Sequence, residues 1–202
     1  MKNIKIGVIA ILALTMVNCK ETKKNAAETT GDINNSVDQM ETNANEMKDD
    51  GMSEPLTVMM TSKSDSDMNG EITFTQTDNE IAMKAVFTGL EEGSHAIHLH
   101  ENADCSSDDG KSAGGHWNPT NEPHGKWGAE EGYHKGDIGN FTADADGNAT
   151  VEFSTDEWCM DCDDENKNIK GRSVIVHKGT DDFTSQPSGD AGSRIGCAGI
   201  TK

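Results

Sequence analysis

The histidines are the residues of this 202-residue chain best suited to do chemistry, and all seven lie between positions 95 and 177. His98 and His100 alternate with Ile97 and Leu99 in an apolar segment. On a β-strand, residues two apart point to the same face, so the two imidazoles project together and the aliphatic neighbours face a core. Two imidazoles on one face form half of a metal site. If it were isolated, a pair of this kind would more often be two surface histidines.

This pair is not isolated, because further ligand types follow it along the chain. They are His116, His124, His134 and Asp137 in and around a Gly-rich segment, and His177 at the end of the apolar segment 174–176. Four imidazoles suit copper, whereas three imidazoles and one carboxylate suit tetrahedral zinc. The seven candidate ligands suffice for two metals if one imidazole is shared.

The segments that must position these ligands have the pattern of β-strands. Apolar and polar residues alternate in the segments 56–61, 72–75, 81–87, 151–153 and 174–176, and turn sequences such as Asp67-Met68-Asn69-Gly70 separate them. We therefore predict short antiparallel strands in an all-β sandwich or barrel. Residues 101–140 and 178–193 do not alternate, and loops of this length in compact domains are usually functional.

Three motifs, in this order, resemble those of the copper–zinc superoxide dismutase family in its exported bacterial form. They are His95-Ala96-Ile97-His98-Leu99-His100-Glu101; then Gly115-His116-Trp117-Asn118-Pro119 with His124 and His134-Lys135-Gly136-Asp137; and last Gly189-Asp190-Ala191-Gly192-Ser193-Arg194-Ile195-Gly196-Cys197. The resemblance covers residues 56–202. It implies a Greek-key antiparallel β-sandwich or barrel, immunoglobulin-like, with two long functional loops.

The resemblance also implies which residues bind each metal. Copper is expected on His98, His100, His116 and His177. Zinc is expected on His116, His124, His134 and Asp137, so that His116 bridges the two metals. A disulfide is expected between Cys105 and Cys197, and Arg194 is expected beside the copper.

The implied reaction is the dismutation of superoxide to dioxygen and hydrogen peroxide. Copper would exchange single electrons, and zinc would order the long loop. His116 would be both ligand and general acid, and Arg194 would dock the superoxide anion. Asp181 is expected to link a copper ligand to a zinc ligand through hydrogen bonds, with Asp182 as the alternative. The rival interpretation is a copper-buffering protein without turnover, which we expect to lack the bridging histidine, the zinc set or the arginine.

Two features have no place in either expected ligand set. His95 shares the core-facing side of its strand and is expected to be a buried structural histidine. Cys159-Met160-Asp161-Cys162 is extra, and we expect a local disulfide between Cys159 and Cys162, with a further metal or redox site as the alternative.

The N-terminus indicates export. Lys2 and Lys5 precede an apolar run, Ile6 to Val17, that is too short to span a bilayer, so residues 1–18 are predicted to be a signal peptide. Cys19 is the predicted lipidation site of a lipoprotein; Asn18 fits that site imperfectly, and a plain secreted protein is the alternative. Residues 19–54 read as a flexible acidic tether, with a surface helix at 37–47 as the alternative, and 55–202 as the dismutase domain.

Charge excludes one class of partner. The chain has 36 acidic and 17 basic residues, a net charge of −19, so it lacks the cations that bind nucleic acid. We expect superoxide as substrate, a membrane contact through the lipid, and a location in the cell envelope, in the periplasm or at the outer membrane or surface. A monomer and a homodimer both remain open. Within loop 178–193 only Lys178 is basic, which leaves the steering of superoxide open.

Overall fold

The computed structural model describes residues 53–78 and 80–201. The predicted signal peptide, the predicted lipidation site Cys19 and nearly all of the predicted tether lie outside this range. Among the described residues, no helix has the length and apolarity that crossing a membrane requires.

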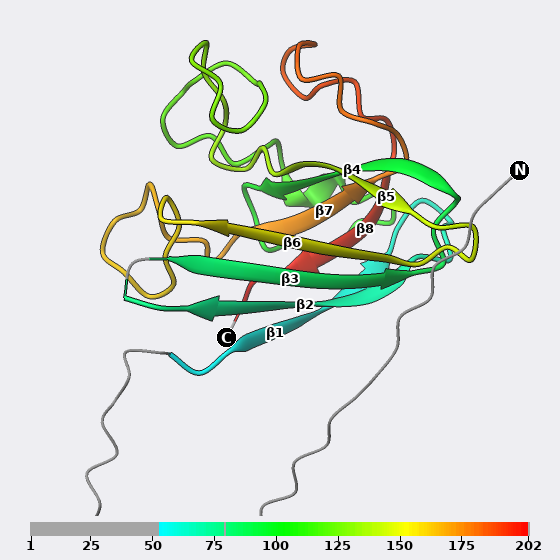
Figure 1. Cartoon of the computed structure of the whole chain (residues 1–202), viewed down its shortest axis with the longest axis horizontal. Helices are drawn as coiled ribbons and strands as arrows, with labels where there is room; N and C mark the ends of the chain where they lie inside the picture. The colour runs from blue at the N-terminus through cyan, green and yellow to red at the C-terminus, as the bar shows by residue number, and fades with distance from the viewer. Residues whose placement is uncertain (1–52, 79, 202) are drawn as a thin grey trace, which may run out of the picture. The chain divides into compact units, whose positions relative to one another are not determined.

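The described chain folds into an antiparallel β-barrel that is nearly closed (Figure 1). Its elements are β1 (Leu56–Ser62), β2 (Asn69–Gln76), β3 (Ile81–Thr88), β4 (Gly93–His100), the short 3₁₀ helix η1 (Lys111–Ala113), β5 (Gly139–Ala143), β6 (Ala149–Thr155), β7 (Ser173–His177) and β8 (Arg194–Gly199). The strand order is β5-β4-β7-β8-β1-β2-β3-β6, and a turn at 144–148 joins the two end strands, β5 and β6. The all-β prediction is confirmed.

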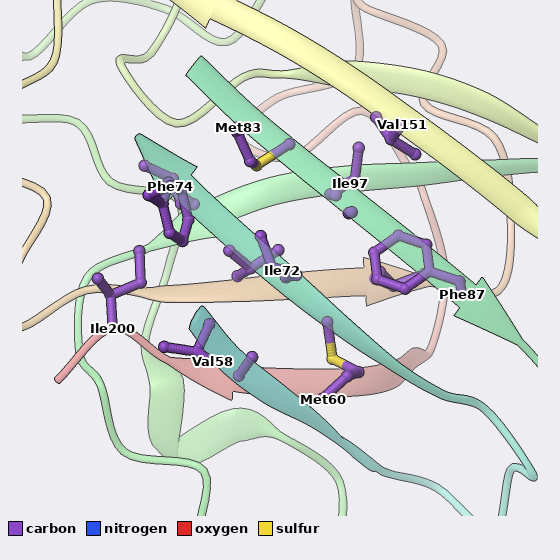
Figure 2. Packing of buried hydrophobic residues seen from close by; sticks show 14 of the residues in the cluster. Val58, Met60, Ile72, Phe74, Met83, Phe87, Ile97, Val151 and Ile200 are labelled. Atoms are coloured by element: carbon purple, nitrogen blue, oxygen red, sulfur yellow. The ribbon is translucent and has the colours of Figure 1, made fainter. Parts of the chain in front are cut away.

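The core forms because alternate residues of each strand point inward. On β3, Ile81, Met83, Ala85 and Phe87 are buried, and the residues between them are exposed. The register sets Ile72 of β2 opposite Ala85, and Figure 2 shows the β2 and β3 side chains packed together. Burying each large aliphatic or aromatic side chain contributes about 1.5–3 kcal/mol.

Strand β4 differs from β3 because it is buried on both faces from His95 to His100. It lies between β5 and β7, with Ile97 opposite Val176 of β7. Ile97 and Leu99 belong to the main core, whereas His98 and His100 project to the opposite side. One central strand therefore supports both the core and the candidate site.

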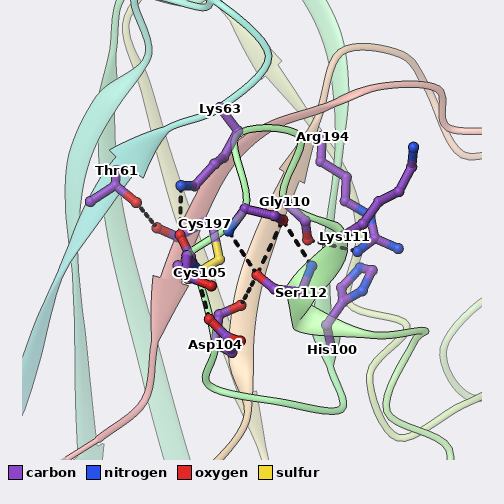
Figure 3. The surroundings of a disulfide bond; sticks show 12 residues. Thr61, Lys63, His100, Asp104, Cys105, Gly110, Lys111, Ser112, Arg194 and Cys197 are labelled. Carbon is purple, nitrogen blue, oxygen red and sulfur yellow. Dashed lines mark hydrogen bonds between the residues drawn. A yellow bond between two sulfur atoms is a disulfide. The ribbon is translucent and has the colours of Figure 1, made fainter.

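Two long connections, residues 101–138 and 178–193, project from the barrel and contact one another through His124 and Asp181 (Figure 1). The first is tied to β8 by a disulfide between Cys105 and Cys197, with a Cα–Cα distance of 5.7 Å. Figure 3 shows Lys63 donating to the carbonyl oxygen of Cys105 at 2.6 Å beside this bridge. The loop that carries the candidate ligands is thus fastened to the barrel wall.

Candidate metal centre

Four histidines from three parts of the fold meet at one point. His98 and His100 come from β4, His177 from the end of β7, and His116 from the first long loop, where it pairs with His100 in an isolated β-bridge. One ring nitrogen from each lies within 4.8 Å of the others. All four residues are buried. The structure therefore brings together the complete set predicted for copper.

The ring nitrogens of this set divide into anchored and unpaired ones. His98 Nε2 lies 2.8 Å from Asp181 Oδ2, His100 Nδ1 lies 3.0 Å from the Gly114 carbonyl oxygen, and His177 Nδ1 lies 3.2 Å from the Gly192 carbonyl oxygen. Within the described part of the chain, the atoms buried without a hydrogen-bond partner include His98 Nδ1, His100 Nε2, His116 Nε2 and His177 Nε2. Buried polar atoms are normally paired, so four unpaired nitrogens converging on one point fit a metal ion.

A second set shares His116 with the first. His116, His124, His134 and Asp137 also offer ligand atoms within 4.8 Å of one another. The Nδ1 atoms of the three imidazoles lie 2.8, 3.0 and 3.3 Å from the Asp137 carboxylate oxygens. Asp137 Oδ2 also accepts hydrogen bonds from the backbone N–H groups of Gly125 and His134 at 3.1 and 2.8 Å, which orients it. Three imidazoles and one carboxylate suit tetrahedral zinc.

Asp181 connects the two sets. Its Oδ2 lies 2.8 Å from His98 Nε2 and its Oδ1 lies 2.9 Å from His124 Nε2, and the side chain is fully buried. The neighbouring Asp182 instead accepts hydrogen bonds from Thr184 and Ser185 in its own turn. Of the two predicted candidates, the structure places Asp181 between the ligand sets.

Two amide side chains that the sequence analysis did not single out hold this arrangement. Gln186 pairs with the main chain of His124, accepting from its N–H and donating to its carbonyl oxygen, both at 2.9 Å. Asn140 pairs with the main chain of Asp181 in the same way, both at 2.8 Å. Nothing in the local sequence marks either residue, because both contacts join segments far apart in the chain.

The electrostatics keep three imidazoles of the first set neutral, those of His100, His116 and His177. Burial, together with the imidazoles of His116 and His177, holds the pKa of His100 well below its usual range. Burial also lowers the pKa of His116 to about 4 and that of His177 to about 3. These rings carry no second proton at neutral pH, so each keeps a lone pair for a metal.

The second set contains ionised groups. Burial alone would raise the pKa of Asp137, but hydrogen bonds from His116, His124 and His134 outweigh it and hold this pKa well below its usual range. Burial would lower the pKa of His124, but Asp137 and Asp181 outweigh it and raise this pKa to about 9. The pair of carboxylates, Asp137 and Asp181, thus makes this second set attractive to a cation.

A hollow of about 430 Å³ opens over the first set, and its lining includes His100, His116, His177 and Arg194. Arg194 Nη1 donates to the Gly110 carbonyl oxygen at 2.8 Å. Lys178 instead pairs with Glu91 at 2.9 Å on the exposed surface. Arg194 is therefore the basic residue that lines this hollow.

The other predicted features lie outside both ligand sets. His95 is buried, with its ring nitrogens 3.0 and 2.9 Å from the carbonyl oxygens of His177 and Glu91, as a structural histidine would be. Cys159 and Cys162 form a disulfide in the loop between β6 and β7.

Comparison with known proteins gives consistent matches. The family model described as "Copper/zinc superoxide dismutase (SODC)" matches residues 68–200. "Superoxide dismutase [Cu-Zn] 2" of Aquifex aeolicus is 34% identical over 134 residues, covering 65% of this chain and 78% of that protein. "Extracellular superoxide dismutase [Cu-Zn]" of Caenorhabditis elegans is 33% identical over 141 residues, covering 67% and 62%.

A solved structure agrees with these sequence matches. A double mutant of a SOD-like protein from Bacillus subtilis superposes with a TM-score of 0.65 at 30% identity, covering 72% of this chain and 97% of that one. The similarity therefore extends over the whole barrel of that protein and includes its topology.

Proposed function

The chain belongs to the copper/zinc superoxide dismutase family, and we propose which of its residues bind each metal, dock the substrate and transfer the proton. The enzyme converts superoxide to dioxygen and hydrogen peroxide, and its metals are copper and zinc. In our proposal His98, His100, His116 and His177 hold copper, and His116, His124, His134 and Asp137 hold zinc. The observation that carries this division is that His116 presents Nε2 to one set and Nδ1 to the other.

The protein's part in the reaction is to bind the anion, orient it and supply a proton. When bound, copper supplies one-electron redox chemistry. Arg194 stays protonated at any physiological pH and presents a planar fork of donors. Its hydrogen bond to Gly110 fixes one donor, and the guanidinium lines the hollow above the copper set. We assign to it the docking of superoxide.

We assign the proton transfer to Nε2 of His116. An imidazole shared by two cations would carry no ring proton, and Nε2 could take one up only while copper does not occupy that nitrogen. His116 also lines the hollow in which Arg194 would dock the anion. A proton held at His116 Nε2 is therefore within reach of the superoxide that is reduced to peroxide, as general-acid catalysis requires.

The location follows from a different part of the chain. We propose that residues 1–18 direct export, that Cys19 carries the lipid anchor, and that residues 19–54 tether the domain in the cell envelope, where it would remove superoxide. Disulfides persist in oxidising compartments, and the described chain contains two of them. Relatives in Caenorhabditis elegans and Brugia pahangi are named extracellular superoxide dismutases. All ligands come from one chain, so a monomer and a homodimer are both compatible with this chemistry.

The test combines metal analysis with a superoxide-consumption assay. The protein loaded with both metals should contain one copper and one zinc per chain and should consume superoxide. His124→Ala should release zinc while copper remains, because His124 belongs to the second set alone. Stoichiometric copper binding without superoxide consumption would instead identify a copper-buffering protein, and zinc in both sites would overturn the division of ligands.

A further inference from the structure

The zinc-ligand segment 133–135 is held by the loop that follows β6. Tyr133 and Lys135 flank the zinc ligand His134, and both bond to one carboxylate, that of Glu157. The Tyr133 hydroxyl donates to Glu157 Oε1 at 2.5 Å, and Lys135 Nζ donates to Glu157 Oε2. Glu157 therefore holds the residue before the ligand and the residue after it.

Glu157 is itself held in place. Its backbone N–H donates to the Thr155 hydroxyl at 3.0 Å, at the end of β6. The next residue, Trp158, is buried and donates from Nε1 to the carbonyl oxygen of Lys135 at 2.8 Å. The side chains of Lys135 and Glu157 are 20% and 26% exposed, so this ion pair is screened less than a surface pair.

Aromatic packing reinforces the same junction. The Trp127 ring lies 5.0 Å from that of Tyr133 and 5.8 Å from that of Trp158, measured between centroids. Phe153 of β6 lies 4.9 Å from Trp127 and 5.0 Å from Trp158. Two segments of the zinc loop are thus packed against β6 and the loop that follows it.

We propose that Glu157 is a positioning residue for the zinc site, acting through Tyr133 and Lys135 to fix the direction of His134 Nδ1. The proposal rests on the assignment of zinc to His116, His124, His134 and Asp137. His134 lies in an irregular loop, where no strand or helix sets its backbone. A side chain that fixes both neighbours reduces the freedom that the ligand must lose when the ion binds.

The test measures how fast zinc leaves the protein carrying both metals, with a chelator in excess. Glu157→Gln keeps the shape of the side chain and removes its charge, and Tyr133→Phe removes one hydroxyl. Loss of an outer partner of a metal ligand commonly costs about 10-fold in affinity or more. We expect zinc release about 10-fold faster in Glu157→Gln, a smaller increase in Tyr133→Phe, and an unchanged rate of copper release.

Glu152→Gln is the matched control, because Glu152 lies on β6 in an exposed ion pair with Lys84 and should leave zinc release unchanged. Cobalt substituted for zinc gives a second readout, since its absorption bands should shift in Glu157→Gln if the ligand geometry changes. Unchanged zinc release in Glu157→Gln, or equally accelerated copper release, would overturn the proposal. His134→Ala tests the zinc assignment separately from the positioning role of Glu157. If this variant keeps its zinc, the zinc assignment itself fails.

Discussion

Asp181 couples the two ligand sets through one carboxylate, with one oxygen on His98 Nε2 and the other on His124 Nε2. The space for this bridge depends on Gly189. A Cβ atom on Gly189 would lie 1.8 Å from Asp181 Oδ1 and 2.7 Å from His124 Nε2. The backbone of Gly189 also has φ +66°, which side chains other than glycine rarely adopt. A methyl group here must displace the carboxylate.

We therefore expect Gly189→Ala to weaken metal binding about 10- to 100-fold, the usual effect of losing an outer partner of a metal ligand. Competition with chelators of known affinity measures this change for each metal. Gly171→Ala is the matched control, since Gly171 has φ +84° but open space around its Cβ position. It carries the same backbone strain without the collision. Equal losses in both variants would show that strain, not the carboxylate, determines the effect.

Replacing Arg194 should change the rate of superoxide consumption but not the binding of either metal. Arg194→Ala should retain both metals and lose about 10-fold or more of the rate, because a cation beside the site concentrates and orients the anion. Arg194→Lys should lose less, since lysine keeps the charge without the fork. In Arg194→Ala the remaining rate should also depend less on ionic strength.

Superoxide consumption at several salt concentrations measures both effects. Full activity of Arg194→Ala at low salt would assign Arg194 a structural role. The cation that attracts superoxide would then have to be sought at Lys178 or in the connection 101–138.

The two disulfides close very different stretches of chain. Cys105 and Cys197 are 92 residues apart, whereas Cys159 and Cys162 are 3 apart. A disulfide restricts the unfolded chain more when it closes a longer loop. Replacing Cys105 and Cys197 by serine should cost about 4–5 kcal/mol of unfolding free energy, and replacing Cys159 and Cys162 only about 2 kcal/mol.

Denaturant titration of both variants, each carrying no metal, measures the difference. An equal loss of unfolding free energy for the two pairs would contradict stabilisation through restriction of the unfolded chain. It would indicate instead that the Cys159–Cys162 bridge stabilises native contacts of the loop between β6 and β7.

The strands could be predicted from the sequence because their signal is local. Burial on β3 alternates with its apolar residues, and the alternation of His98 and His100 with aliphatic residues places both imidazoles on one side of β4. The irregular loops carry no such period. The copper and zinc ligands there were predicted by resemblance to a family, and their assignment to metals stays a prediction. The structure does bring both sets together.

The supporting contacts could not be predicted, because they connect distant segments. Gln186 and His124 are 62 residues apart, and Glu157 and Tyr133 are 24 apart. A glutamine or a glutamate in a loop is usually solvated, and only the fold shows that these two face the zinc loop. Asp181 and Asp182 are adjacent and chemically identical, so their separation into two roles also required the structure.

The titration of the buried imidazoles predicts how the stability of the folded protein depends on pH. The folded-state pKa of His116 is about 4 and that of His177 about 3, against about 6.5 in the unfolded chain. Below pH 6.5 the unfolded chain binds more protons at these residues, so the stability they contribute is lost as pH falls. His124 has a raised pKa of about 9, so its contribution is complete below pH 6.5 and is lost as pH rises towards 9.

The metal-free protein should therefore be most stable near pH 6.5 and lose stability on either side. Thermal unfolding of metal-stripped protein between pH 5 and pH 9 checks this. In His124→Asn the alkaline loss should diminish while the acid loss persists. A melting temperature that rises steadily from pH 7 to pH 5 would contradict the burial of neutral imidazoles.

The net charge of −19 makes the molecule as a whole repel an anion. The access of superoxide therefore depends on the local arrangement at the hollow that Arg194 lines. The proposed mechanism requires that two metals share His116, one at each ring nitrogen. Anomalous diffraction at the copper and zinc absorption edges, from crystals of protein loaded with both metals, locates each metal. We expect a copper peak at His116 Nε2 among His98, His100 and His177, and a zinc peak at His116 Nδ1 among His124, His134 and Asp137. A single peak, or peaks with these two positions exchanged, would contradict it.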